Sequence, residues 1–359
     1  MDRVPFKVCY VLTGTPDDPY TDMTLLSVWS LKATNPTALP VLMGDTRTID
    51  SLRTYRNDFL KEFDEIIAVE TPAGDGVFRN RFVKTTMRFH LKGHFIYLDS
   101  DTLIRGDLTP ISSIDVDFAA ARNNNGTGSP IEMVDKELVV FAKLGWRFPT
   151  TYYANGGVLF LADSPKCHKF SQIWHDKWLA SVSVTGKSFD QPALNSALYE
   201  SDVPFAWLDN RYNAQVFARP DTANDAVIWH IFGALHATCP KTLFVSGREC
   251  LRRNDARVAF LSSLRDASRP WLDEGQMRRW RRQLQAEYLH VVIYMMLLAS
   301  KRLEALRFLL THLRVLPRVR PARMALSICW CTIFTGRPPS WFTAKGHYVR
   351  FIYFFSPLV

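Results

Sequence analysis

A short apolar run that ends in two closely spaced carboxylates limits what this chain can fold into. Phe95–Leu98 has the length and composition of a buried strand, and Asp99 and Asp101 follow directly, with Ser100 between them. Carboxylates at the end of a buried strand are costly to desolvate without a partner. A divalent cation such as Mn²⁺ or Mg²⁺ is the usual partner, bound through carboxylates and substrate phosphates. An isolated Asp-x-Asp is more often a solvated turn, so the rest of the chain has to decide.

Strands and helices alternate in the first part of the chain. We expect strands at residues 6–12, 39–43 and 65–69, helices at 23–33 and 49–63, and a loop at 13–20. Further on, residues 78–91 are expected to form a helix that carries several cations, and 118–121 a strand. This order predicts a mainly parallel sheet covered by helices on both faces. Open sheets of this kind bind ligands beyond the carboxyl ends of their strands, which is where Asp99 lies.

Three later stretches add polar groups that can serve a site. Asn155-Gly156-Gly157 lies in a strand-like segment, where the glycines permit close approach and Asn155 offers both a donor and an acceptor. A bulged core strand is the alternative interpretation. Residues 123–129 form a polar loop, either a lid or a plain connection.

The other two stretches carry an acid and a histidine. Asp190-Gln191 stands at the start of a helix, where Asp190 alternatively serves only as the helix cap. His230 ends the apolar segment 227–230, and Gly233 follows three residues later. A histidine on an apolar strand is often a core residue, but a neutral imidazole beside two carboxylates is also a reasonable ligand set for Mn²⁺.

In this order the stretches resemble the retaining GT-A glycosyltransferases, the family 8 group that includes glycogenin and the bacterial lipopolysaccharide galactosyltransferases. The resemblance covers roughly residues 5–240. It implies the α/β GT-A fold, a Rossmann-like nucleotide-diphospho-sugar transferase with a mixed, mainly parallel sheet flanked by helices. It also implies a metal-dependent, retaining transfer of a sugar from a nucleotide sugar, most often UDP-linked, to an acceptor that can be a glycan, a lipid or a protein.

The resemblance assigns roles to residues of this chain. Asp99, Asp101 and His230 would hold Mn²⁺ or Mg²⁺, and Asp190 and Gln191 would face the sugar and its anomeric centre. The substrate-binding positions would be Thr13, Tyr20, Lys84, Ser100, Asn155, Gly156, Gly157, Gly233 and His236. Within this set, Thr13 and Tyr20 would hold the base and ribose, although Tyr20 reads equally well as a surface aromatic. Lys84 would face the diphosphate.

Two positions depart from the family pattern. Arg147 stands where glycogenin-like enzymes carry an aspartate eight residues before the Asn155 position, which leaves the sugar and the acceptor chemistry open. His236 stands where the family often has a lysine on the diphosphate, and Lys241 lies a few residues on. Either of the two could replace that lysine.

The charge of the chain is uneven. The net charge is +9, yet residues 1–268 hold 29 Lys and Arg against 31 Asp and Glu, whereas residues 269–359 hold 15 against 4. We therefore expect a catalytic domain at 1–265 and a basic, aromatic-rich helical region at 266–359 that contacts an anionic membrane surface through residues 270–359. A small helical bundle packed on the catalytic domain is the alternative for that region.

Other features set the expected location. The six cysteines form no CxxC pair, no signal peptide is recognisable, and no stretch of 18 apolar residues occurs. We expect a cytoplasmic protein, peripheral at the membrane.

Two other functions compete with glycosyl transfer. A nucleotidyltransferase also pairs carboxylates with a metal and a nucleotide, but no glycine-rich triphosphate loop follows the first strand. A degenerate GT-A scaffold that binds membrane or nucleic acid through its basic tail would explain the charge, although no nucleic acid partner is expected while Asp99, Asp101 and His230 are all present.

Overall fold

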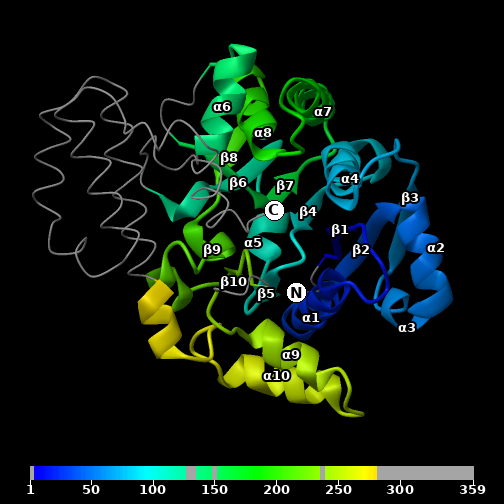
Figure 1. Cartoon of the computed structure of the whole chain (residues 1–359), viewed down its shortest axis with the longest axis vertical. Coiled ribbons are helices and arrows are strands. Elements are labelled where there is room, and N and C mark those ends of the chain that lie inside the picture. The colour runs from blue at the N-terminus through cyan, green and yellow to red at the C-terminus, as the bar shows by residue number, and fades with distance from the viewer. Residues whose placement is uncertain (1–3, 127–134, 148–151, 235–238, 281–359) are drawn as a thin grey trace, which may run out of the picture. The chain divides into compact units, whose positions relative to one another are not determined.

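The computed structural model describes residues 4–126, 135–147, 152–234 and 239–280. The chain divides into two compact units, and the first contains the described residues up to 234 together with 242–270 (Figure 1). Apart from Lys241, the predicted site residues of the described chain fall in this first unit.

The first unit is built on a seven-stranded sheet of order β3-β2-β1-β4-β7-β6-β8. Its strands are β1 (Phe6–Leu12), β2 (Ala38–Asp45), β3 (Glu65–Val69), β4 (Phe95–Leu98), β6 (Phe118–Arg122), β7 (Ala154–Leu161) and β8 (Phe205–Trp207). Strands β3, β2, β1 and β4 are parallel, β6 and β8 are parallel to each other, and β7 runs antiparallel to both β4 and β6. The predicted mixed, mainly parallel α/β sheet is confirmed.

Helices connect and cover these strands (Figure 1). They are α1 (Pro19–Thr34), α2 (Thr46–Tyr55), α3 (Asn57–Leu60), α4 (Gly76–His90), α5 (Thr109–Ser112), α6 (Asp135–Leu144), α7 (Pro165–Thr185), α8 (Gln191–Glu200), α9 (Leu243–Cys250) and α10 (Ala256–Asp266). Asp18, Asp45, Asp75 and Ser164 cap the long helices α1, α2, α4 and α7 through side-chain acceptors, as expected for residues that satisfy free N–H groups.

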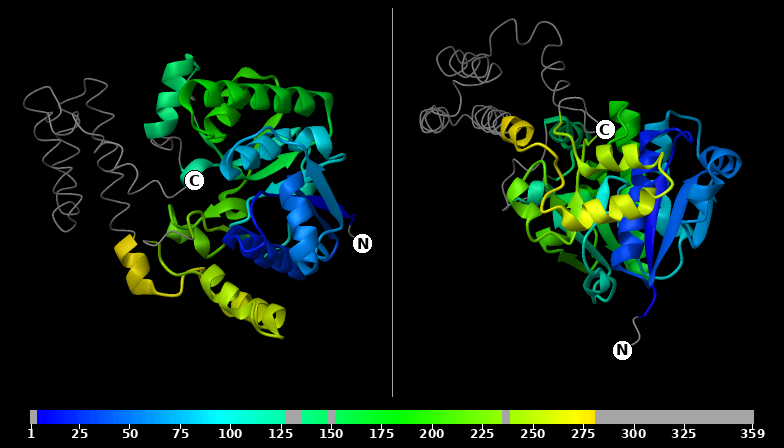
Figure 2. Two further views of the ribbon diagram at one scale, coloured as in Figure 1. Left: turned by 45° about the vertical axis from the view of Figure 1, so that its right-hand side comes forward. Right: turned by 90° about the horizontal axis from the view of Figure 1, so that it is seen from below.

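The core lies between the central strands and the helices α4 and α7. Strands buried on both faces read as continuous apolar runs, and all of Phe95–Leu98 and Ala154–Leu161 is buried. Trp174 and Trp178 of α7 are buried in the same cluster as Val83 of α4. On the other side of the unit α9 and α10 lie side by side and pack on α1 (Figure 2).

A second, three-stranded sheet carries the segment around His230. Strand β10 (Ile228–His230) pairs antiparallel with β5 (Thr102–Ile104) and parallel with β9 (Ala214–Gln215). The short 3₁₀ helix η3 (Asn210–Asn213) leads directly into β9. This sheet brings residues about 100 positions apart in the chain next to the end of β4.

Three local predictions need correction or completion. The helix predicted at residues 49–63 is two helices, because Arg56 leaves helical geometry with φ −137° and its guanidinium binds Pro16 O at 3.1 Å. The loop predicted at 13–20 is shorter, since Pro19 starts α1. In the polar loop 123–129, residues 123–125 form a 3₁₀ turn with Asn124 and Asn125 at positive φ, Gly126 ends the turn, and 127–129 lie outside the described residues.

Residues 239–241 and 271–280 belong to the second unit. Leu272 N donates to Lys241 O at 2.8 Å, and Lys241 N donates to Gln276 Oε1 at 3.0 Å. Most of the predicted region 266–359 lies outside the described residues, so its boundary at 265 and its helical nature stay predictions. Among the described helices, none combines the length and apolar character that crossing a membrane requires.

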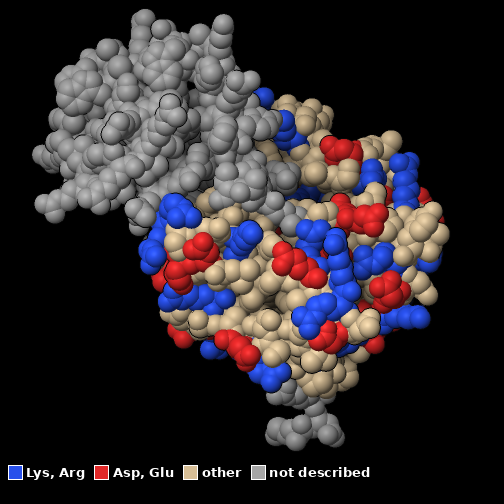
Figure 3. Space-filling view, turned by 60° about the horizontal axis from the view of Figure 1, so that its bottom comes forward, with Lys and Arg blue, Asp and Glu red and all other residues tan. Residues whose placement is uncertain are grey.

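Surface charge can be compared with the uneven charge of the sequence. On the face shown in Figure 3, basic and acidic side chains of the described residues are interspersed. This fits the near balance of charge over residues 1–268.

Candidate metal and substrate site

The two aspartates lie where the order of the sheet reverses. Strand β1 has β2 on one side and β4 on the other, both parallel to it, so the chain changes direction across the sheet at this point. Asp99 follows β4 at its carboxyl end, and Asp99 N donates to Gly157 O of the neighbouring strand at 2.8 Å. Asp99 therefore lies at the carboxyl end of a strand, as predicted from sequence, and the strand order adds that this is a topological switch point.

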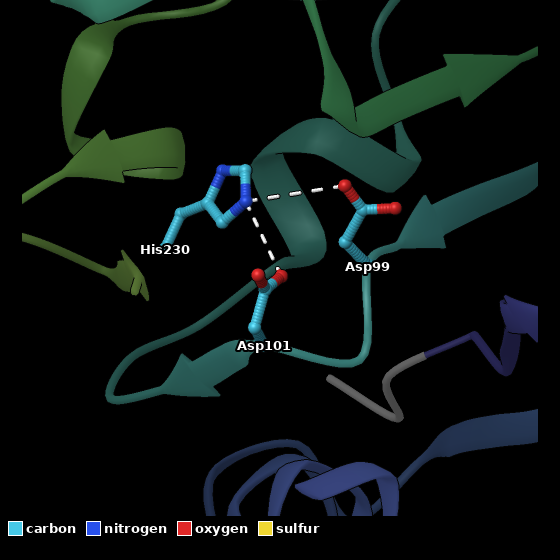
Figure 4. A group of neighbouring side chains, drawn as sticks. All are labelled: Asp99, Asp101 and His230. Atoms are coloured by element: carbon cyan, nitrogen blue, oxygen red, sulfur yellow. Dashed lines mark ion pairs between the residues drawn. The ribbon is translucent and has the colours of Figure 1, made fainter. Parts of the chain in front are cut away.

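His230 reaches the aspartates through the second sheet. It pairs with Thr102 across β10 and β5, and Ile231 N donates to Asp101 O at 2.8 Å. His230 Nε2 lies 3.3 Å from Asp101 Oδ1 and 3.9 Å from Asp99 Oδ2 (Figure 4). One ligand atom from each residue lies within 4.8 Å of the others. The three predicted metal ligands are therefore brought together.

The charges of this cluster depend on one another. Burial alone would lower the pKa of His230, but the carboxylates of Asp101 and Asp99 have the larger combined effect and raise it above its ordinary value. Burial alone would raise the pKa of Asp99, but the positive charges of Lys84, His230 and Arg81 together have the larger effect and lower it below its ordinary value. Two carboxylates and an imidazole that faces them through Nε2 form a donor set that suits Mn²⁺, and the side chains of Asp99 and Asp101 are partly exposed to solvent.

Two cations from α4 lie beside the cluster. The ammonium of Lys84 is buried and lies 3.2 Å from Asp99 Oδ1 and 3.2 Å from Asp190 Oδ2. Arg81 Nε lies 3.0 Å from Asp190 Oδ1. Burial alone would raise the pKa of Asp190, but Lys84 and Arg81 together have the larger effect and lower it, so Asp190 stays ionised. Asp190 stands at the N-cap position of α8, yet its side chain makes no cap hydrogen bond, so the capping alternative is wrong.

The Asn155-Gly156-Gly157 segment lies beside Asp99 because β7 runs antiparallel to β4 and begins beyond its end. Gly156 N donates to Gln191 Oε1 at 3.2 Å, which fixes the amide of Gln191 next to this segment. A Cβ on Gly156 would lie 3.4 Å from Lys84 Nζ and 3.6 Å from Asp190 Oδ2, which places this glycine in ordinary contact distance of both charged groups. The segment is a buried strand whose register shifts against β6, and Asn155 Oδ1 accepts from Gly157 N, as the bulged-strand alternative expects. Close approach of a sugar to the glycines stays a prediction.

Three further predicted residues, Tyr20, Ser100 and Thr13, are described by their contacts with the neighbouring segments. Tyr20 is 41% exposed, and its pKa is raised to about 12 by burial of its hydroxyl and by the carboxylate of Asp101. Ser100 Oγ accepts a hydrogen bond from Thr24 Oγ1 of α1 at 2.8 Å. Thr13 Oγ1 donates to Gly76 O at the start of α4, also at 2.8 Å. Tyr20 is thus electrostatically coupled to the aspartates, whereas Thr13 and Ser100 hold neighbouring backbone segments together.

For the remaining predicted positions the structure shows no contact with the Asp99, Asp101 and His230 cluster among the described residues. Gly233 follows β10 with φ +71°, a conformation that favours glycine. Arg147 is exposed after α6, and Lys241 belongs to the second unit. His236 lies outside the described residues.

Two residues of the site were missed at the level of sequence. The hydroxyl of Tyr97 donates a short hydrogen bond to Asp99 Oδ1, and Lys84 Nζ lies 4.8 Å from the centre of its ring. Its position two residues before Asp99, on the same side of the strand, could have indicated this contact. Asn213 Oδ1 lies 2.8 Å from His230 Nδ1, and nothing local in the sequence pairs these two residues.

Comparison with known proteins gives only structural similarity. No family model matches the sequence, and no curated protein matches it. Among solved structures, the galactosyltransferase LgtC in complex with donor and acceptor sugar analogs is 16% identical, with 58% of this chain and 75% of LgtC covered and a TM-score of 0.40.

Two other solved structures are similar to the same degree. The glycosyltransferase GlyE of Streptococcus pneumoniae TIGR4 is 20% identical, with 61% of this chain and 49% of GlyE covered and a TM-score of 0.40. Mouse xyloside xylosyltransferase 1 is 15% identical, with 59% and 88% covered and a TM-score of 0.41. Likeness at this level carries no argument about activity, so the function has to rest on the geometry of this chain's own residues.

Proposed function

We propose that this protein is a metal-dependent glycosyltransferase of the GT-A type that transfers a sugar from a nucleotide sugar, UDP-linked by preference, to an acceptor. The observation that carries the proposal is the convergence of Asp99, Asp101 and His230 at the switch point of the sheet, with buried Lys84 beside them. A diphosphate needs both elements, a cation held by carboxylates and a fixed positive charge nearby.

The donor set fits Mn²⁺ or Mg²⁺, with Asp99, Asp101 and His230 as ligands. When bound, such an ion neutralises charge that develops on the leaving diphosphate. The ammonium of Lys84 lies 3.2 Å from Asp99 Oδ1 and adds a positive charge beside the cation site. Because this ammonium is already buried, little reorganisation is needed when the diphosphate binds.

Asp190 and Gln191 are the residues proposed to face the anomeric centre. Asp190 is kept ionised by Lys84 and Arg81, so it can stabilise positive charge that develops on the sugar ring. Gln191 is oriented from both ends of its amide, since Oε1 accepts from Gly156 N at 3.2 Å and Nε2 donates to Glu137 Oε1 at 3.4 Å, and in the proposal this fixed amide faces the sugar or the acceptor. Retention of configuration is part of the proposal on the basis of the family resemblance, and the anomer of the product, read by NMR, tests it.

The degenerate-scaffold alternative is less well supported. A scaffold without catalysis has no need to keep three ligand atoms within 4.8 Å or to bury a lysine between two carboxylates. Contact of residues 270–359 with an anionic membrane remains compatible with the enzyme and is proposed alongside it.

Calorimetric titration of UDP into the full chain, with Mn²⁺ and then with EDTA, tests the proposal. We expect binding that requires the metal and that Asp101→Asn abolishes without loss of the folded state. Asp50→Asn is the control, because Asp50 pairs with Arg53 on the exposed face of α2. Binding that is unchanged in EDTA or in Asp101→Asn would sink the metal assignment.

A further inference from the structure

Helix α6 brings a buried carboxylate to the start of α8. Glu137, in the first turn of α6, is 7% exposed, and its Oε1 accepts a hydrogen bond from Gln191 Nε2 at 3.4 Å. The two helices lie beside each other (Figure 1), and Gln191 is the first residue of α8. Glutamate is almost never fully buried unless it is paired, so this contact indicates why a carboxylate occupies the position.

The amide of Gln191 is held at both ends. The N–H of Gly156 can only donate, so the amide atom that lies 3.2 Å from it is Oε1. The other end of the amide, Nε2, then faces the carboxylate of Glu137, which accepts. Two groups from two different elements, β7 and α6, therefore require the same orientation of this amide. The backbone is held as well, because Asn195 Nδ2 donates to Gln191 O at 2.9 Å.

The carboxylate itself has a fixed place. One turn after Glu137 on α6, the buried Phe141 packs on the buried Tyr153, with ring centres 6.3 Å apart, and Tyr153 directly precedes β7. Burial, followed by the charge of Glu137, raises the pKa of Tyr153 well above its ordinary value, so the hydroxyl keeps its proton and stays a donor. Glu137 thus approaches Gln191 from a helix that is docked against the strand carrying Gly156.

We propose that Glu137 is a positioning residue which, together with Gly156 N, fixes the side-chain amide of Gln191 in one orientation toward the substrate. The proposal rests on the proposed function, which places Gln191 at the donor sugar or the acceptor. A charged acceptor on Nε2 makes a stronger hydrogen bond than a neutral one and restrains the amide before the substrate binds. Groups that are preorganised in this way lose little conformational freedom when the substrate arrives.

The fixed amide also indicates which chemical group it recognises. Nε2 has two N–H groups and Oε1 has two lone pairs, and the contacts with Glu137 and Gly156 use one of each. Within the described residues, one donor and one acceptor of the same amide remain. A hydroxyl both donates and accepts, so a sugar hydroxyl matches this pair, whereas a carboxylate or a phosphate would use only the donor.

Two substitutions of Glu137 separate the hydrogen bond from the packing of α6. Glu137→Gln keeps an oxygen that can accept from Gln191 Nε2, whereas Glu137→Leu fills a similar volume without an acceptor. Val140→Ala is the matched control, because Val140 is 2% exposed on the same helix. This control removes apolar contacts of α6 and no hydrogen-bond acceptor.

The measurement is the ¹⁵N order parameter of the Gln191 side-chain amide in the metal-free, UDP-free full chain, labelled selectively with ¹⁵N-glutamine. The chain has six glutamines, and Gln191→Glu identifies the signal of Gln191. We expect a rigid amide in wild type, Glu137→Gln and Val140→Ala, and a fall of the order parameter below about 0.6, the range of flexible groups, in Glu137→Leu. UDP is then titrated into the same variants with Mn²⁺ by calorimetry. We expect equal UDP affinity in Glu137→Leu and wild type, because Gln191 is proposed to face the sugar and not the UDP.

The outcomes are distinct. A Gln191 amide that is rigid in Glu137→Gln and mobile in Glu137→Leu, with UDP affinity unchanged, supports the proposal. An amide that is mobile in wild type, that stays rigid in Glu137→Leu, or that Val140→Ala mobilises to the same extent overturns it. Loss of UDP binding in Glu137→Leu alone also overturns it, since Glu137 would then support the whole site. A wild type that binds no UDP but shows the expected amide dynamics supports the role of Glu137 and overturns the proposed function instead.

Discussion

A Cβ on Gly157 would lie 2.2 Å from Cε1 of His230 and 2.7 Å from its Nδ1. The histidine therefore occupies the space that any other residue at 157 would fill, and the metal site depends on a missing side chain.

Gly157→Ala should displace His230 and weaken Mn²⁺ binding. Overpacking of a well-packed site costs about 1–3 kcal/mol, so we also expect a lower free energy of unfolding. Calorimetric Mn²⁺ titration and urea unfolding measure the two effects. Gly76→Ala is the control, because a Cβ there meets nothing within 4 Å and its site is the first residue of α4. Equal Mn²⁺ affinity in Gly157→Ala and wild type would contradict the role of Gly157.

The raised pKa of His230 predicts how Mn²⁺ binding depends on pH. Below that pKa, which lies above the ordinary value of about 6.5, Nε2 carries a proton that the metal must displace. Asp99 stays ionised in this range because its pKa is lowered. We expect the affinity to fall by about tenfold for each pH unit below the pKa of His230, with release of a proton on binding.

Calorimetry in buffers of different ionisation enthalpy measures the released proton. His94→Gln should keep the same pH slope, because His94 accepts from Asp163 N and is not part of the cluster. Affinity that does not change between pH 5 and 8 would rule out His230 as a ligand. In metal-free protein the sign is opposite: protonated His230 stabilises the native state fully below about pH 6.5, and this contribution is lost as pH rises through the folded pKa.

Several strands of the large sheet could be predicted from sequence because their signals are local. Strands β1, β3 and β4 have the predicted bounds, since each is a short apolar run between turn residues. The break at Arg56 could not be seen, because the buried Leu52 and Phe59 lie on either side of it and keep helical spacing.

Contacts between distant segments were predictable only where a motif marks both partners. Resemblance pointed to His230 and the aspartates together, and the structure brings them together. Asn213 carries no such mark, because its contact with His230 depends on the pairing of two strands that are only two and three residues long. Short strands of this kind have no periodicity to detect.

Lys84→Met should be strongly destabilising, because it leaves the buried Asp190 and the partly buried Asp99 without the ammonium that pairs with both. Breaking one partner of a buried pair costs about 3–5 kcal/mol, and Arg81 on Asp190 should place this change toward the lower end. Urea unfolding measures the cost.

A double-mutant cycle identifies the cause. In Lys84→Met, the further change Asp190→Asn should cost less than it does in wild type, with a coupling of about 0.5–3 kcal/mol. Lys177→Met is the control, since the Lys177–Glu200 pair is partly exposed and should contribute less than about 1 kcal/mol. Additive costs in the cycle would contradict direct pairing of Lys84 with Asp190.

The basic composition of residues 269–359 predicts binding to anionic vesicles. Each Lys or Arg near such a surface contributes about 1 kcal/mol, so replacing Arg278, Arg279, Arg281 and Arg282 by Gln should weaken binding by up to about 4 kcal/mol. Co-sedimentation of the full chain with phosphatidylserine-containing vesicles measures this, and the difference should shrink as salt is raised.

Four exposed lysines of the first unit, Lys61, Lys92, Lys166 and Lys169, provide the matched control. Their replacement by Gln removes the same charge from a part of the chain whose basic and acidic residues are nearly balanced, so binding should change little. If both fourfold variants lose binding equally, net charge alone explains the attraction and the tail has no special part. If neither variant loses binding, electrostatic attraction through the arginines is wrong, and the apolar faces of the tail would have to carry any contact with the membrane.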